Sequence, residues 1–250
     1  MSLSGSIALV TGATQGIGRA TALRLAEDGA HVVCADIQPT DGTVEEIGNA
    51  GGSGESVWLD VRSADAWSKA TSGVREKHGR IDHLANVAGV VNLLSEDTVV
   101  GLTEEAWQQV IDTDLKGPWL GMRAVIPGMI DTGGGRIVNI SSLAALRGLP
   151  NLASYTAAKA GVAGLTRQAA YEYAKHNILI NAIAPGTIDT PILADITEEM
   201  RRANADAHMI RRLGDPAEIA SMAAYFFREG SFLTGLTYPV DGGWSSKGNF

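Results

Sequence analysis

The chain has 250 residues, of which 45% are hydrophobic and 19% charged, as in an ordinary globular protein. Its formal charge of −8 argues against a nucleic-acid partner, because such binding rests largely on Lys and Arg. No apolar run is long enough to cross a membrane, and residues 1–6 lack the basic start of a secretory signal. The single cysteine, Cys34, excludes an internal disulfide and suits a reducing compartment, so we expect a cytoplasmic location.

Short β-branched runs alternate with longer helical patterns along the chain. The predicted strands are Ile7–Val10, His31–Ala35, Ser56–Leu59, Ile81–Ala85, Arg136–Ile140, Ile178–Ala184 and Leu236–Val240. The predicted helices include Gly18–Asp28, Ala64–His78, Glu104–Met129, Ser154–Lys175 and Pro216–Phe227. Several strands are apolar throughout, as expected when a parallel sheet is buried on both faces. The order predicts an α/β fold, a Rossmann-like doubly wound parallel sheet with helices on both faces.

No proline-rich linker, low-complexity tract or repeat divides the chain, and the glycine clusters Gly48–Gly54 and Gly133–Gly135 resemble turns. We therefore expect residues 1–250 to form a single domain, with a substrate lid around residues 190–212.

A glycine-rich loop, TGATQGIG, follows the first predicted strand. Glycine allows a pyrophosphate to approach the backbone and the free amides of a helix N-terminus. The pattern alone is a weak signal and also fits a tight turn without a ligand, but its place in the first strand–helix unit favours nucleotide binding. The loop residues assigned to the cofactor are Gly12, Thr14, Gln15, Gly16, Ile17 and Gly18.

Asp36 ends the second predicted strand, 18 residues after Gly18. An acidic side chain there can accept hydrogen bonds from both hydroxyls of an adenosine ribose and would repel a 2′-phosphate. No cation in the loop or directly after Asp36 offsets that repulsion, so we expect NAD(H) rather than NADP(H). Asp60 closes the third strand in the same way and could receive the adenine amino group.

The segment YTAAK places Tyr155 and Lys159 four residues apart on one face of a predicted helix. A nearby Lys and the positive oxidised nicotinamide both favour the tyrosine phenolate, which can then exchange a proton with an alcohol. Ser142 ends a predicted strand, where its hydroxyl could position the substrate oxygen. Taken singly, the pair also fits a partly exposed helix face, and Ser141 and Ser142 also fit a turn.

Together these motifs resemble the classical branch of the short-chain dehydrogenase/reductase family over essentially the whole chain. The carrying motifs are TGATQGIG, Asp60–Val61, NVAG at Asn86–Gly89, Ser142, YTAAK, PGTIDT at Pro185–Thr190 and VDGG at Val240–Gly243. The resemblance implies an NAD-dependent oxidoreductase and a homotetramer. It assigns sheet stability and cofactor packing to Asn86, Ala88 and Gly89, and the nicotinamide contacts to Ile188 and Thr190, with Val61, Pro185 and Gly186 also in the cofactor site.

One departure concerns catalysis, because DLKG at Asp114–Gly117 stands where the family has NLxG. In the family, that Asn is a fourth catalytic residue, which bends its helix and holds a water that contacts the lysine. If the backbone carbonyl holds the water, Asp114 can serve nearly as well. If the side chain matters, the carboxylate would oppose Lys159 and move the pH optimum upward; Asp114 could also simply face a neighbouring helix.

No metal-ligand spacing joins the five histidines, of which His31 starts a strand and His78, His83, His176 and His208 resemble surface or helix-end residues, so we expect no metal. The predicted substrate pocket is mostly apolar, with the single nearby cation Arg147, and its apolar residues are Val90, Val91, Leu93, Leu143, Leu146, Leu149, Leu152, Ile192, Leu193 and Met209.

The expected reaction interconverts a secondary alcohol and a ketone on an apolar alicyclic, aromatic or aliphatic small molecule. A 3-oxoacyl thioester reductase is the alternative, although Asp36 disfavours the NADPH that such reductases commonly use. A catalytically inactive, cofactor-binding regulatory protein is a second alternative, which the intact Ser142, Tyr155 and Lys159 oppose.

Overall fold

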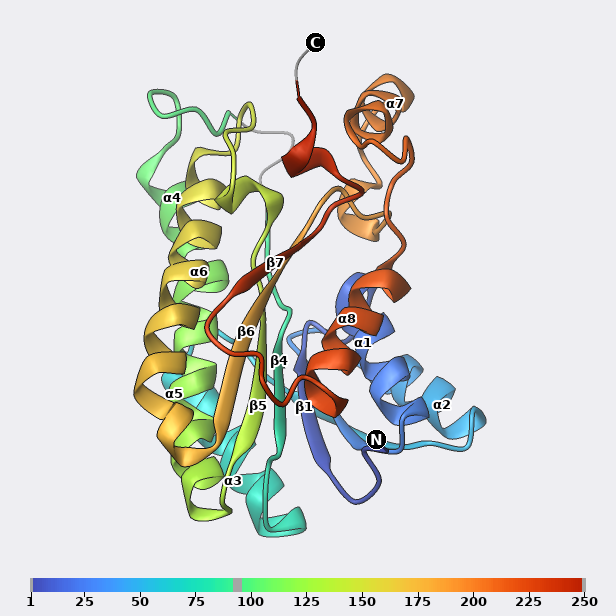
Figure 1. Cartoon of the computed structure of the whole chain (residues 1–250), viewed down its shortest axis with the longest axis vertical. Helices are drawn as coiled ribbons and strands as arrows, with labels where there is room; N and C mark the ends of the chain where they lie inside the picture. The colour runs from blue at the N-terminus through green and yellow to red at the C-terminus, as the bar shows by residue number, and fades with distance from the viewer. Residues whose placement is uncertain (1, 92–95, 249–250) are drawn as a thin grey trace.

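The computed structural model describes residues 2–91 and 96–248 and contains one seven-stranded parallel sheet, ordered β3-β2-β1-β4-β5-β6-β7 (Figure 1). The strands are β1 (Ile7–Thr11), β2 (His31–Asp36), β3 (Ser53–Trp58), β4 (His83–Asn86), β5 (Gly135–Ile140), β6 (Ile178–Pro185) and β7 (Thr237–Val240). The chain crosses from β3 to the far side of β1, so the order confirms the predicted doubly wound α/β fold.

Helices cover both faces of the sheet. They are α1 (Gly16–Glu27), α2 (Asp41–Asn49), α3 (Ala64–His78), α4 (Glu104–Ile111), α5 (Gly117–Asp131), α6 (Ala153–Tyr173), α7 (Glu198–Ala207) and α8 (Pro216–Arg228). Helices α1, α2 and α8 lie on one side, and α3, α4, α5 and α6 lie on the other (Figure 1). Helix α7 stands beyond the carboxyl ends of the strands.

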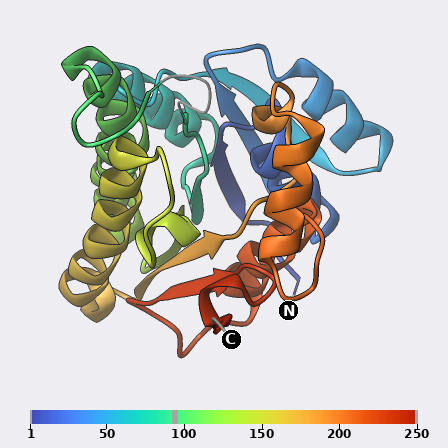
Figure 2. The ribbon, with the colours of Figure 1, turned by 90° about the horizontal axis from the view of Figure 1, so that it is seen from above.

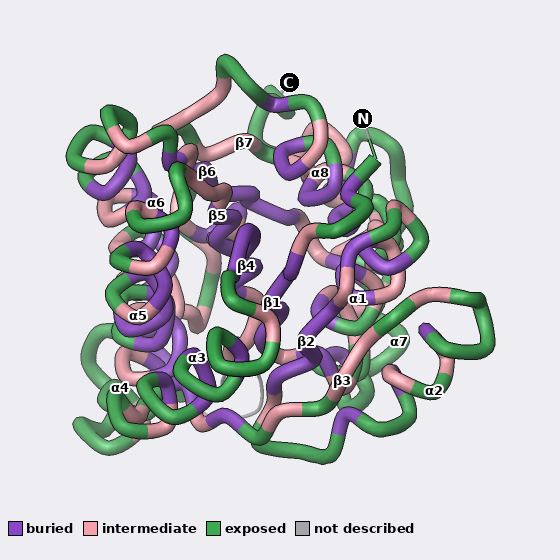
Figure 3. Tube along the Cα trace, turned by 90° about the horizontal axis from the view of Figure 1, so that it is seen from below, coloured by how far each residue is buried: buried purple, intermediate pink, exposed green. Residues whose placement is uncertain are grey.

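Side chains alternate between the two faces of the sheet along each strand, and each face forms an apolar core with the helices that cover it. In β1, Ala8 and Val10 pack with α1 and α8, whereas Ile7 and Leu9 pack with α3 and α5. All four side chains are buried, as the continuous apolar run predicts for a strand covered on both faces. Buried residues accordingly follow the inner strands, while exposed residues follow the outer helices (Figure 3).

Several predicted boundaries were wrong. Helix α1 begins at Gly16 rather than Gly18, and β3 spans Ser53–Trp58 rather than Ser56–Leu59, which places Gly54 in a strand and not a turn. The predicted helix Glu104–Met129 is α4 and α5 joined by a π-helical turn, Asp112–Lys116. Helices α2 and α7 were not predicted. Among the described residues, no helix combines the length and the apolar character needed to span a membrane.

Candidate active site

A cleft of about 520 Å³ lies at the carboxyl ends of the strands. Figure 2 looks onto this end of the sheet, with α7 on one side and α4 and α6 on the other. The predicted site residues that line the cleft are Gly12, Gln15, Gly16, Ile17, Gly18, Asp36, Asp60, Val61, Ala88, Gly89, Asp114, Ser142, Tyr155, Lys159, Pro185, Gly186, Ile188 and Thr190. The remaining two, Thr14 and Asn86, lie behind its wall.

The glycines of the loop allow close packing of the backbone beside the cleft. A Cβ atom on Gly12 would lie 2.9 Å from the Cα of Ala88, and one on Gly18 would lie 2.0 Å from the carbonyl oxygen of Gly12. Gly16 has φ +55°, a left-handed conformation that favours glycine. Helix α1 then begins without a side-chain cap on its first amides. Those amides lie at the wall of the cleft, where the glycines present no side chain. This arrangement fits the pyrophosphate of a dinucleotide.

Asp36 is held at the rim of this cleft by backbone donors. Its Oδ2 accepts a hydrogen bond from the amide of Thr14 at 3.2 Å, and its Oδ1 accepts one from the amide of Gln38 at 3.1 Å. Thr14 thus acts on the carboxylate rather than lining the cleft. Asp36 presents a fixed negative charge where the ribose of a dinucleotide would lie in this fold.

Arg62 is a cleft residue that the sequence reasoning missed. It binds Asp60 through two contacts, Nε to Oδ1 at 2.9 Å and Nη2 to Oδ2 at 2.8 Å. The hydrogen bond with Arg62, although opposed by partial burial, lowers the pKa of Asp60 below its usual range. Asp60 is thereby kept as a carboxylate, with lone pairs left for an amino group.

Asn86 has a structural position. It is buried, and its Nδ2 donates to Asn139 Oδ1 at 2.8 Å on the neighbouring strand β5. A Cβ on Gly121 of α5 would lie 2.6 Å from its Oδ1, so the helix packs directly on the amide. This position agrees with the role in sheet stability that the family resemblance implies.

Tyr155 and Lys159 lie in the first two turns of α6 and face the cleft together. The Lys159 Nζ lies 5.4 Å from the centre of the Tyr155 ring and donates to the carbonyl of Ile140, at the end of β5, at 3.0 Å. The two serines have separate roles. Ser141 Oγ donates to the carbonyl of Lys159 at 2.9 Å, which ties β5 to α6, whereas Ser142 lines the cleft and is hydrogen bonded to Tyr155.

Asp114 lies against Lys159 and is fully buried. Its Oδ1 accepts from the amide of Val90 at 2.8 Å, and its Oδ2 lies 3.1 Å from Lys159 Nζ. Gly89 is necessary for this approach, because a Cβ there would lie 2.7 Å from Asp114 Oδ2. The carboxylate sits in the π-helical turn between α4 and α5, a local widening that often marks functional sites. Asp114 therefore contacts Lys159, the predicted catalytic lysine, and not a helix partner alone.

These groups have opposing effects on the pKa values of Tyr155 and Lys159. Burial raises the pKa of Tyr155, and Asp114 raises it further, against the lowering effects of Lys159 and the hydrogen bond with Ser142. Burial would lower the pKa of Lys159, but Asp114 and Tyr155 raise it above its usual range. Lys159 is thus a cation at neutral pH and lowers the pKa of Tyr155, as the sequence predicts. Burial and Asp114 outweigh this effect, so the pKa of Tyr155 lies above its usual value rather than below it.

The other half of the cleft is apolar. The predicted substrate-pocket residues that line it are Val90, Val91, Leu143, Leu149, Leu152, Ile192 and Leu193. Leu146 and Met209 are instead about half exposed and do not line it, and Leu93 falls outside the described residues. Arg147 is an exposed loop residue that donates to the carbonyl of Trp244 at 2.9 Å, and it does not line the cleft.

The segment after β6 covers this apolar half. Thr187 donates through its amide to His208 Nε2 at 3.2 Å, and its hydroxyl is hydrogen bonded to Asn204 of α7 at 2.9 Å. Met200 and Asn204 of α7 also line the cleft, and both fall in the segment around residues 190–212 that the sequence predicts to be a substrate lid.

Two histidines are not the surface residues that the sequence suggested. His83 is buried in β4, its ring centre 4.9 Å from that of Phe227, and burial lowers its pKa to about 4. His208 is only 2% exposed. A third surprise is that His31, Glu55 and His78 come together on the outer part of the sheet, at positions whose spacing in the sequence gives no signal.

Comparisons with known proteins agree with this geometry. A family model described as enoyl-(acyl carrier protein) reductase matches residues 12–245. Cyclohexanol dehydrogenase from Acinetobacter sp. strain SE19 is 38% identical over 245 residues, which cover 96% of this chain and 95% of that protein. The 3-oxoacyl-acyl-carrier-protein reductase of Thermotoga maritima is 37% identical over 246 residues, with 97% and 99% covered.

A solved structure from Agrobacterium tumefaciens is similar throughout. It contains bound NADP, is provisionally assigned as a 2-deoxy-D-gluconate 3-dehydrogenase, and has a TM-score of 0.89 at 35% identity, with 98% of both chains covered. The motifs, the fold and these relatives agree, and the chain belongs to the classical short-chain dehydrogenase/reductase family of nicotinamide-dependent oxidoreductases.

Proposed function

We propose that the protein is an NAD(H)-dependent oxidoreductase that interconverts a secondary alcohol and a ketone on an apolar, most simply alicyclic, small molecule. The observation that carries this proposal is the meeting of Ser142, Tyr155 and Lys159 in one cleft, of which the half that would receive the substrate is largely apolar. A regulatory protein with an inactive site would not need Ser142, Tyr155 and Lys159 together, and their presence favours an enzyme.

The catalytic residues would divide the work in a simple way. When bound, the oxidised cofactor supplies the hydride acceptor and a positive charge beside Tyr155. Ser142 donates a hydrogen bond to the substrate oxygen, and Tyr155 takes the proton of the alcohol during oxidation or returns it during reduction. Lys159, a cation held by Asp114, stabilises the phenolate and binds the nicotinamide ribose.

The cofactor preference rests on charge. A 2′-phosphate would lie against the fixed carboxylate of Asp36. Among the described residues that line the cleft, Arg62 and Lys159 are the only lysine or arginine side chains, and both are already paired with Asp60 and Asp114. No free cation is left to attract the phosphate, which supports NAD(H). The Agrobacterium relative that holds NADP makes this preference a point that must be measured.

The substrate class follows from the cleft wall and from one relative. Leu149, Leu152, Ile192 and Met200 present apolar surface to the reacting region, and Arg147 is not among the lining residues. An uncharged ring fits this wall better than a sugar acid or a phosphate does. The name of the Acinetobacter relative agrees with a cyclic secondary alcohol.

A panel of substrates tests the proposal. We expect NAD-dependent oxidation of cyclohexanol or a substituted cyclohexanol, followed by absorbance of the reduced nicotinamide, and slower turnover with NADP. The Thermotoga relative makes an acyl thioester the second candidate. Acetoacetyl-coenzyme A reduced by NADPH with a higher kcat/KM than any cyclic ketone with NADH would replace the proposal by that candidate.

A further inference from the structure

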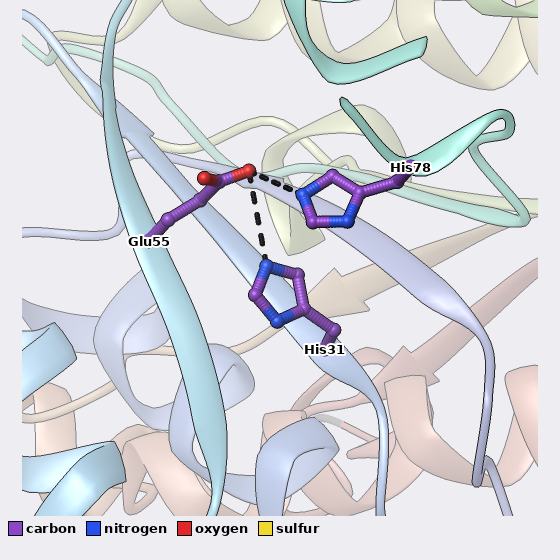
Figure 4. A group of neighbouring side chains, drawn as sticks. All are labelled: His31, Glu55 and His78. Carbon is purple, nitrogen blue, oxygen red and sulfur yellow. Dashed lines mark hydrogen bonds and ion pairs between the residues drawn. The ribbon is translucent and has the colours of Figure 1, made fainter. Parts of the chain in front are cut away.

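A cluster of three metal-ligating side chains lies at the end of the sheet opposite the active site. His31 is the first residue of β2, Glu55 lies in β3 and His78 is the last residue of α3 (Figure 4). One ligand atom from each lies within 4.8 Å of the other two. Asp36, in the cofactor cleft, ends the same strand that His31 begins, so the two sites are about 16 Å apart along β2.

The fold itself brings the three residues together. His31 pairs with Ser53 in the parallel register of β2 and β3, so both side chains point to the same face, and Glu55 follows on that face two residues later. Helix α3 packs on this face through Trp67 and Val74. His78 lies one helical turn beyond Val74, at the helix end that returns to the start of the strands.

The separations fit a divalent metal ion. The Glu55 Oε1 lies 2.7 Å from His78 Nε2 and 3.8 Å from His31 Nε2. Two ligands of a tetrahedral zinc ion are about 3.3 Å apart, given zinc–ligand distances of about 2.0–2.1 Å. The observed distances bracket that value. Side-chain adjustments of about half an ångström would bring both pairs to that separation, and the two histidine ligand atoms already lie within 4.8 Å of each other.

The orientation of the His31 ring also fits that of a metal ligand. His31 Nδ1 lies 2.6 Å from Ser53 Oγ, and its Nε2 is buried without a hydrogen-bond partner. A ring that donates Nδ1–H to an oxygen directs a lone pair from Nε2, which is how ligating histidines are commonly oriented.

The surroundings of the three ligands include a cation that competes for Glu55 and access from solvent. Lys77 forms an ion pair with Glu55 Oε2, the oxygen that does not face the histidines. The three ligand side chains are each about one-fifth exposed (22%, 20% and 16%), and the buried His31 Nε2 needs only a small side-chain movement to admit an ion, which would take a water as its fourth ligand.

We propose that His31, Glu55 and His78 form a binding site for a divalent transition metal ion of the zinc type. Two imidazoles and one carboxylate are a ligand set that zinc uses in proteins. The ion would join the outermost strand β3 to β2 and to the end of α3, and would thereby stabilise that edge of the sheet. The site is independent of the proposed reaction, since none of its ligands lines the cleft.

Calorimetric titration of the full-length chain, without a polyhistidine tag, with zinc chloride tests this site. We expect one zinc ion per chain in the wild type and in the matched control His176→Gln, which removes a histidine outside the cluster. His78→Gln and Glu55→Gln should each weaken binding at least tenfold. Lys77→Gln, which removes the competing ammonium from Glu55, should bind zinc at least as tightly as the wild type.

Thermal unfolding gives a second readout on the same proteins. A ligand that binds only the folded state raises the melting temperature, so zinc should stabilise the wild type and His176→Gln but not His78→Gln. NADH binding should be the same in all variants and so shows that each is folded. Equal zinc affinity in the wild type, Glu55→Gln and His78→Gln, or no zinc binding by the wild type, would overturn the proposal.

Discussion

The carboxylate of Asp114 and the ammonium of Lys159 form a buried ion pair, with Oδ2 and Nζ 3.1 Å apart and their side chains 0% and 4% exposed. The family resemblance leads one to expect a neutral Asn at this position. Here Asp114 adds a negative charge beside Lys159, the residue that lowers the pKa of Tyr155. This charge keeps Lys159 cationic and raises the pKa of Tyr155.

Asp114→Asn should therefore change the pH dependence of the reaction. Alcohol oxidation needs the Tyr155 phenolate, so its rate rises as pH passes upward through the pKa of Tyr155. Removing the carboxylate removes one cause of the raised pKa, and the rising limb of kcat/KM for oxidation should move to lower pH. A full pH–rate profile of both proteins measures this. A profile that does not move would mean that only the backbone at position 114 matters.

Lys159→Ala should destabilise the fold as well as the reaction. It leaves a buried carboxylate without its cation, a change that costs about 3–5 kcal/mol in comparable pairs. Burial raises the folded-state pKa of Asp114, so the penalty should be complete at pH above that pKa and shrink as pH falls and the carboxyl becomes protonated. Urea unfolding at several pH values measures it.

The double variant Asp114→Asn/Lys159→Ala is the control for this effect. It removes both charges and should recover part of the stability lost in the single variant. If the single and double variants unfold at the same urea concentration, the carboxylate is not penalised by burial, and the electrostatic account of Asp114 is wrong.

Asp36→Ala should reduce the preference for NAD over NADP. It removes hydrogen bonds to the ribose and repulsion of a 2′-phosphate together. Hydrogen bonds to charged groups contribute about 1.5–3 kcal/mol, so kcat/KM with NAD should fall about tenfold or more, while that with NADP should rise. The exposed Asp131→Ala is a matched control for net charge. A wild type that uses NADP at least as well as NAD would contradict this assignment.

A homotetramer remains the expected assembly. Two groups of exposed apolar side chains lie on different parts of the surface, Trp119 and Tyr171 on α5 and α6, and Phe232 and Leu236 before β7, with Tyr171 87% and Phe232 100% exposed. Two such patches on one chain can form two different two-fold interfaces. Light scattering should give four chains, and Tyr171→Glu or Phe232→Glu should give two. A monomeric wild type at micromolar concentration would contradict the prediction.

The sheet could be predicted from the sequence because its chemistry is local. Strands buried on both faces have continuous apolar runs that few other structures require, such as the first four residues of Ile7–Thr11. Helix α2 lacks such a pattern, since Gly42 and Gly48 lower its helix propensity and only Thr43 and Ile47 are buried. Helix α7 has no buried residue at all. Neither helix therefore presents the buried apolar face by which an amphipathic helix is recognised in a sequence.

The sequence predicts which residues form the site, but not how their charges and burial change one another's pKa values. Most of the residues read from the motifs line one cleft, because each follows the carboxyl end of a parallel strand or faces it from a helix. The pairing of Asp60 with Arg62, the π-helical turn at Asp114 and the raised pKa of Tyr155 depend on distances and burial, which spacing along the chain does not encode.

The central claim is that Tyr155 is the acid–base group of an NAD-dependent alcohol dehydrogenase. Its most direct test is kcat for oxidation of the best cyclic alcohol by the wild type and by Tyr155→Phe, with NADH affinity measured by fluorescence. Phenylalanine keeps the ring and its packing but lacks the ionisable oxygen. We predict unchanged NADH affinity and a loss in kcat of at least about 10²-fold, the lower end of general acid–base contributions. Near-wild-type oxidation by Tyr155→Phe would contradict the account.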